Sequence, residues 1–171
     1  DGQPTALANG DDTIGSDDED GVVFSQMVPG GGGTITVVVN STLLGGFVSA
    51  WVDFNGDGDW NDANEWIAAA QPVVNGVNTL AFQVPPNAVV STSTSPLTFA
   101  RVRLDATNTP IGPMGFGNAG EVEDYAVTIG PLPTISINDV TVTEPDRNQT
   151  VTASFTVTLA VPYSNTVTVN F

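Results

Sequence analysis

The residues best suited to chemistry in this sequence are oxygen ligands crowded into the segment 53–65. Asp53, Asn55 and Asp57 take positions 1, 3 and 5 of a loop, and Gly58 takes position 6, where the chain must turn sharply. Such spacing suits a hard cation of the size of Ca²⁺, and position 7 would add the backbone carbonyl of Asp59. We therefore predict a Ca²⁺ site built from Asp53, Asn55, Asp57, Asp59 and Glu65, with Asp62 as a substitute ligand.

This loop departs from the helix–loop–helix calcium site. Position 12 is Asn64, the acidic Glu65 comes one residue later, and a strand pattern leads into the loop. A calcium loop in a β-protein fits this arrangement, whereas the alternative is a solvated Asn/Asp/Gly turn without an ion. Mg²⁺ fits less well because it keeps its waters, and transition metals favour His or Cys.

Composition narrows the possible functions. The chain of 171 residues has 19 acidic residues against 3 Arg, with no Lys, His or Cys, and a formal charge of −16. A Ser–His triad, a Schiff base and a thiol nucleophile are excluded, and this charge would repel nucleic acid. We expect no enzyme activity, since loop carboxylates that bind an ion are not available for acid–base catalysis. No apolar run approaches 18 residues, so we expect no membrane-spanning segment.

A second acidic constellation joins two motifs that each precede an apolar run. We expect both motifs to lie at strand starts, where they would meet around a cation. The equally weighted alternative is two charged turns without a ligand. The second candidate metal site consists of Asp17, Asp18, Asp20, Glu121, Glu123 and Asp124.

Short runs rich in Val, Thr, Ile and Phe, separated by Gly, Pro, Asn and Asp, predict an all-β chain with little helix. The expected fold is an antiparallel β-sandwich. Along residues 97–105, the face with Ala100 and Val102 is expected to be the core. The expected strands are 34–40, 47–54, 65–68, 77–84, 97–105, 122–129, 134–143, 151–159 and 166–171.

Two prolines, Pro131 and Pro133, mark the predicted domain boundary. We predict a calcium-binding sandwich over 1–130 and an incomplete second sandwich over 131–171. Chains of fewer than about 40 residues rarely fold without a disulfide, a bound metal or a partner. The tail strands therefore need a cover, either on the first domain or on a neighbouring molecule by strand addition.

Three stretches in order, at 10–22, 51–60 and 120–125, resemble the GEVED domain, a β-sandwich module of bacterial secreted and surface proteins. The resemblance covers about residues 1–130 and implies calcium binding by Asp53, Asn55, Asp57 and Glu65. The tail, residues 133–171, resembles the beginning of a Calx-beta domain, a calcium-associated sandwich found in bacterial adhesins, with its later strands missing.

Two functions from different classes compete. The first is a calcium-stabilised extracellular module of a surface fibre or adhesin, a homo-polymer joined head-to-tail through its C-terminal strands. Because sortase-type polymerisation and isopeptide crosslinks both need a Lys amine, and the chain has no Lys, we expect its assembly to be non-covalent. The second is a glycan-binding module in which Trp51, Trp60 and Trp66, around the loop, form a stacking platform for sugar rings, with Trp60 the most exposed. The competing expectation is that Trp51 and Trp66 belong to the core. Because the chain starts at Asp1, we expect a removed leader or an excerpt of a longer protein.

Overall fold

The computed structural model contains only β-strands as regular secondary structure in its described residues, which are 21–40, 45–92, 97–109, 112–115, 120–160, 163 and 166–170. The chain divides into two compact units, 1–131 and 132–171. The strands in the described ranges are β1 Val22–Phe24, β2 Gly32–Val39, β3 Gly45–Val52, β4 Trp66–Val74, β5 Gly76–Gln83, β6 Thr98–Asp105, β7 Gly120–Val127, β8 Ile135–Ile137 and β9 Val157–Leu159. No described helix is long and apolar enough to cross a membrane.

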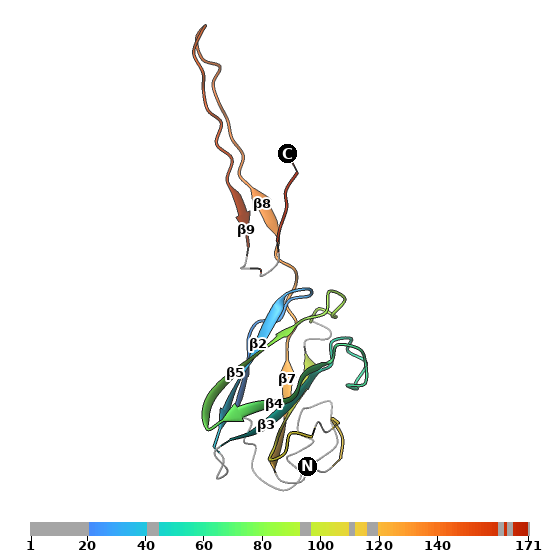
Figure 1. The fold of residues 1–171 in the computed structure, drawn as a ribbon. Helices are drawn as coiled ribbons and strands as arrows, with labels where there is room; N and C mark the ends of the chain where they lie inside the picture. Colours follow the sequence, from blue (N-terminus) through green and yellow to red (C-terminus); the bar gives the residue numbers. More distant parts are fainter. Residues whose placement is uncertain are drawn as a thin grey trace. The chain divides into compact units, whose positions relative to one another are not determined.

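The first unit is a β-sandwich of two antiparallel sheets (Figure 1). One sheet has the order β1-β2-β5 and the other the order β4-β3-β6-β7. β3 pairs with both β4 and β6, so the loop that follows β3 starts from the middle of the larger sheet. The expected fold class is therefore confirmed.

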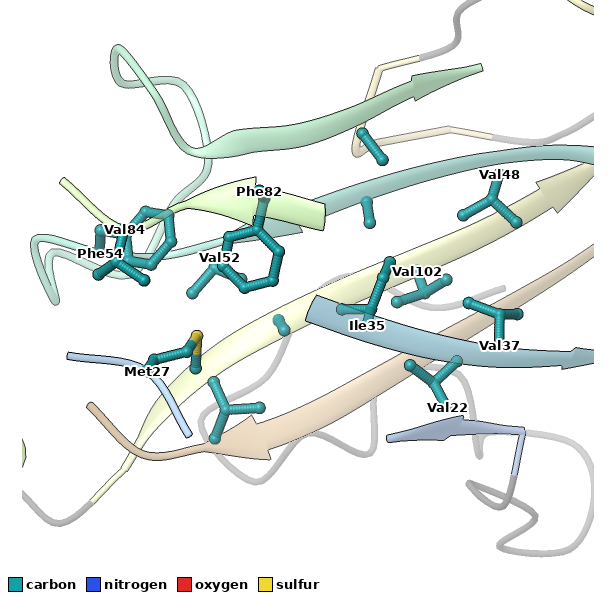
Figure 2. Packing of buried hydrophobic residues seen from close by; sticks show 14 of the residues in the cluster. Val22, Met27, Ile35, Val37, Val48, Val52, Phe54, Phe82, Val84 and Val102 are labelled. Carbon is teal, nitrogen blue, oxygen red and sulfur yellow. The ribbon is translucent and has the colours of Figure 1, made fainter. Parts of the chain in front are cut away.

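Alternating apolar residues from the two sheets meet in the core (Figure 2). Ile35 and Val37 of β2 face Val48 of β3 and Val102 of β6, all of them buried. Ala100 and Val102 lie on the buried face of β6, as the alternation predicts, because side chains two residues apart point to the same side of a strand. This core fixes the end of β3, from which the acidic loop projects.

β4 is longer than predicted. The sequence predicted a strand over 65–68 only, whereas the observed β4 also contains Pro72, which lacks an amide hydrogen for the sheet. In the structure β4 runs to Val74 and lies at the edge of its sheet, where a proline is tolerated. Two register shifts between β3 and β4 accommodate additional residues, including Ala70 with φ of 42°.

The tail unit is less regular than its sequence indicated. β8 and β9 pair over three residues each, and the segment 166–170 contains no strand, although strands were expected over 134–143, 151–159 and 166–171. The apolar side chains of the tail, for which the sequence analysis expected a cover, are exposed: Phe155 is 62% and Val157 50% accessible. Strand propensity is present, but among the described residues of this unit no second layer buries the apolar face.

Candidate metal centre

The acidic loop 53–65 links β3 to β4 and is closed at its base by a backbone hydrogen bond. The amide of Val52 donates to the carbonyl of Glu65 over 2.9 Å, and the amide of Asp53 donates to the carbonyl of Phe99 in β6 over 2.9 Å. Asp53 and Glu65 are both buried, at 3% and 1% exposure. The loop therefore has two buried carboxylates at its ends and exposed acids between them.

Asp53 shapes the first half of the loop. Its Oδ1 accepts from the amide of Gly56 over 2.6 Å, and its Oδ2 accepts from the amide of Gly58 over 3.0 Å. Both glycines have positive φ, 73° and 93°, a conformation that side-chain-bearing residues rarely adopt. The turn at Gly58 is thus made possible by the positive φ of glycine and is stabilised by the hydrogen bond to the Asp53 carboxylate.

Glu65 closes the second half. Its Oε1 accepts from the amide of Phe54 over 3.0 Å, and its Oε2 accepts from the amide of Asp62 over 3.3 Å. Burial raises the pKa of the Glu65 carboxyl above its ordinary value of 4.5, although the backbone donors oppose this shift. Negative Asp53 nearby raises it further. The ionised form of Glu65 is therefore disfavoured, and a proton or a nearby cation would offset this cost.

The exposed acids converge. Asp57, Asp59 and Asp62 each offer a carboxylate oxygen, and these oxygens all lie within 4.8 Å of one another. The amide nitrogen of Asn55 donates to Asp57 over 3.0 Å and to Asp62 over 2.7 Å. That amide therefore places two N–H groups where negative charge is densest, which offsets part of the repulsion between the carboxylates.

This arrangement offers a cation only oxygen ligands. Carboxylate and amide oxygens match the preference of Ca²⁺, provided that the Asn55 amide rotates to present its oxygen. Asp57, Asp59 and Asp62 form the cluster. Asp53 and Glu65 hydrogen-bond to the loop backbone. Ligation by these five residues and by Asn55 stays a prediction.

A Glu65→Gln substitution tests the buried carboxyl in EDTA. Because the folded-state pKa is raised, the contribution of Glu65 to stability is complete below the unfolded pKa and is lost as the pH rises through the folded pKa. Relative to Glu65→Gln, whose amide cannot ionise, the wild-type free energy of unfolding should fall as the pH rises above 4.5. Denaturant titrations of both proteins at several pH values measure this difference, and a pH-independent difference contradicts the expectation.

Trp60 is buried, so the prediction that it is exposed is wrong. Only 5% of the residue is accessible, and its Nε1 donates to the carbonyl of Phe99 over 3.3 Å. The guanidinium carbon of Arg101 lies 5.1 Å from the ring centroid, a cation–π contact. Trp60 therefore fastens the acidic loop to β6 and offers no sugar-stacking surface.

The other two tryptophans differ from each other. Trp51 is buried at 1% exposure, as expected, whereas Trp66 is 45% exposed and not part of the core. Their rings are stacked, with centroids 5.7 Å apart and planes at 15°. Across the larger sheet, the register places Trp66, Trp51, Arg101 and Asp124 in one row.

Arg101 is the residue that sequence reasoning missed. Its Nε and Nη2 donate to the two oxygens of Asp124, each over 2.6 Å, and both residues are 2% exposed. Its Nη1 donates to the carbonyl of Pro113 over 2.9 Å. Arg101 thus joins three segments: the acidic loop through Trp60, the strand β7 through Asp124, and the loop that contains Pro113.

Arg103, two residues further along β6, makes a second set of contacts of this kind. It is 1% exposed and donates to the carbonyls of Gly112 over 2.9 Å and Gly115 over 2.8 Å. Burial and the charge of Arg101 lower its pKa. A signal was available in the sequence, because two of only three Arg lie at alternate positions of an apolar strand.

Of the second candidate site, Asp17, Asp18 and Asp20 lie outside the described residues. Gly21, which follows them, is close to Glu123: a Cβ on Gly21 would lie 3.2 Å from its Oε1. Glu123 also accepts a hydrogen bond from the hydroxyl of Tyr125. Glu121 is exposed, and Asp124 binds Arg101. A cation shared by the two motifs stays a prediction.

Comparison with known families finds one match relevant to this site: residues 47–128 match the GEVED domain. The matched range runs from the third residue of β3 to the end of β7 and includes the acidic loop, both buried arginines and Asp124. The resemblance of the tail to a Calx-beta domain stays a prediction. Neither curated proteins nor solved structures gave a significant match.

Proposed function

We propose, from the GEVED match over residues 47–128, that this chain is a calcium-stabilised extracellular module of a bacterial surface fibre or adhesin. The observation that carries the proposal is the convergence of Asp57, Asp59 and Asp62 in a loop anchored to β6. Its role is structural, without catalysis. Its cation is Ca²⁺, bound by oxygen ligands of the acidic loop.

Calcium stabilises the sandwich because the ion neutralises carboxylates that otherwise repel one another. The chain carries a formal charge of −16, and only three Arg are present to offset it. Two of these, Arg101 and Arg103, are buried on β6, so they do not neutralise the exposed acidic cluster. A divalent ion at the loop supplies the missing positive charge and ties β3 to β4.

Assembly proceeds non-covalently through the tail, with C-terminal strands of one molecule covered by the next. The exposed apolar residues of the tail support this step: Ile137 is 60% and Phe155 62% accessible. Contiguous exposed apolar side chains at strand spacing are typical of an interaction surface. A contact between two different surfaces of identical molecules propagates head-to-tail into a filament.

A substitution in the tail tests assembly. We expect Phe155→Asp to abolish most of the light scattering that the wild-type protein develops in calcium, because a charge would have to be buried at the contact. Ser154→Asp adds the same charge on the opposite side of the extended segment and should retain scattering. Electron microscopy with negative staining shows whether the scattering particles are fibres. A wild-type protein that stays monomeric at high concentration in calcium would refute assembly.

A further inference from the structure

The turn between β8 and β9 contains an asparagine with positive φ. The chain leaves β8, reverses at residues 146–149 and returns to β9 (Figure 1). The amide of Gln149 donates to the carbonyl of Asp146 over 3.0 Å, which closes a β-turn, and Asn148 is its third residue with φ of 71°. Glycine and asparagine are the residues that tolerate this conformation best. The turn alone therefore explains either residue at this position.

The side chain of Asn148 takes no part in holding the turn. Among the described residues, neither Asn148 nor Thr150 makes a side-chain hydrogen bond, and both are exposed. Asn78 differs, because its amide nitrogen donates to the carbonyls of Val74 over 2.7 Å and Gly76 over 3.0 Å. The amide of Asn148 is thus accessible to a reagent from outside the chain.

The residues around Asn148 have the pattern of an N-glycosylation acceptor. Asn148, Gln149 and Thr150 match Asn-X-Thr, with a residue other than proline in the middle. Asp146 adds a carboxylate two positions before the asparagine, where bacterial oligosaccharyltransferases bind an acidic side chain. All five residues from 146 to 150 are exposed. A transferase can therefore bind this segment without disturbing packed structure.

Asn40 begins a second Asn-X-Thr pattern and provides an internal comparison. Val38, not an acid, stands two positions before it. Val39, which directly precedes Asn40, is 4% exposed and belongs to the sandwich core. A transferase that binds residues on both sides of Asn40 would have to remove Val39 from the core, which costs burial free energy. The sequence pattern and the burial both favour Asn148 over Asn40.

We propose that Asn148 is the acceptor of an N-linked glycan. This inference rests on the extracellular location in the proposed function, and it is independent of calcium binding and of assembly. The donor is an oligosaccharide whose anomeric carbon is linked to a lipid diphosphate. Nδ2 of Asn148 attacks that carbon and forms a C–N bond, while the C–O bond to the diphosphate breaks. The lipid diphosphate leaves with the bonding electron pair, and Nδ2 releases one proton to a base of the transferase.

A glycan at this turn would shield apolar residues of the tail. Val142 and Val151, on either side of the turn, are 46% and 49% exposed. Exposed apolar side chains promote association, and a bulky, solubilising sugar opposes it. The modification therefore suits a tail that has to stay soluble until it meets its partner.

Glycan transfer to the folded full chain tests the site. The protein is incubated with a purified bacterial oligosaccharyltransferase and its lipid-linked oligosaccharide, and mass spectrometry measures the product. We expect one glycan per chain, located at Asn148. Asn148→Gly keeps the turn and should abolish transfer, whereas Thr150→Ser keeps the acceptor pattern and should retain it. Asp146→Asn should slow transfer at least about tenfold, because a charge-assisted hydrogen bond to the transferase is lost.

The matched control is Asn40→Gln, which should leave transfer unchanged. Transfer to Asn40 but not to Asn148 would overturn the inference, and so would an unmodified wild-type chain. Neither result affects calcium binding or assembly, which the melting and scattering measurements test separately. If the chain accepts the glycan at Asn148 but neither binds calcium nor assembles, the acceptor site stands and the proposed function fails.

Discussion

In calcium, the protein is expected to unfold at a temperature about 10 °C higher than in EDTA. A ligand at about 100 times its Kd stabilises the folded state by roughly 2.7 kcal/mol. For a domain of this size each kcal/mol raises the Tm by about 4 °C. The effect is expected to be large because the fold brings Asp57, Asp59 and Asp62 together, whereas the unfolded chain does not, so the ion binds the folded state selectively.

The Asp57→Asn variant sharpens this prediction because its effect should depend on calcium. In calcium the substitution removes a ligand and lowers the Tm, whereas in EDTA it removes a like charge from the cluster and leaves the Tm unchanged or slightly higher. Asp139→Asn, which changes an exposed acid of the tail in the same way, is the control. Differential scanning fluorimetry with and without calcium measures all three proteins. Equal melting of the wild-type protein in both conditions would refute calcium stabilisation.

The sandwich and the acidic loop could be predicted because both depend on local patterns. Alternation along 97–105 identified the face of Ala100 and Val102 as core, and the spacing of Asp53, Asn55 and Asp57 identified the loop. The position of Asp62 beside Asp57 and Asp59 was less visible, because it depends on how the loop folds back on itself. Strand periodicity and ligand spacing are properties of residues close together in the sequence, so both can be recognised without knowledge of distant contacts.

The burial of Trp60 and Arg101 could not be predicted in the same way. Alternation assigns residues to two faces of a strand but does not say what covers the second face. Here the acidic loop and the segment 112–115 cover it, through contacts between residues 39 and 12 positions apart. The prediction of long strands in the tail was wrong for the opposite reason. Its strand pattern is strong, but Phe155 is exposed and no second layer covers it in the described part of the tail, so strand propensity overestimated the length of its strands.

The buried Arg101–Asp124 pair gives the second large prediction. Arg101→Met should lower the free energy of unfolding by about 3–5 kcal/mol, because the Asp124 carboxylate stays buried without its arginine. The substitution also removes the cation–π contact with Trp60 and the hydrogen bond to Pro113. Chemical denaturation in calcium, followed by tryptophan fluorescence, measures the loss.

Two further variants separate the charge from the packing. Arg101→Met/Asp124→Leu should recover part of the lost stability, because removing both members of a buried pair leaves no isolated charge. Arg147→Met makes the same change at the exposed arginine of the tail and should alter stability by less than about 0.5 kcal/mol. If Arg101→Met is as mild as Arg147→Met, the pair contributes little. The contact through Trp60 also predicts that Arg101→Met weakens calcium binding, since the loop loses one of its attachments to β6. Such a loss of affinity would distinguish a clamp that positions the metal loop from an ion pair that only stabilises the sheet.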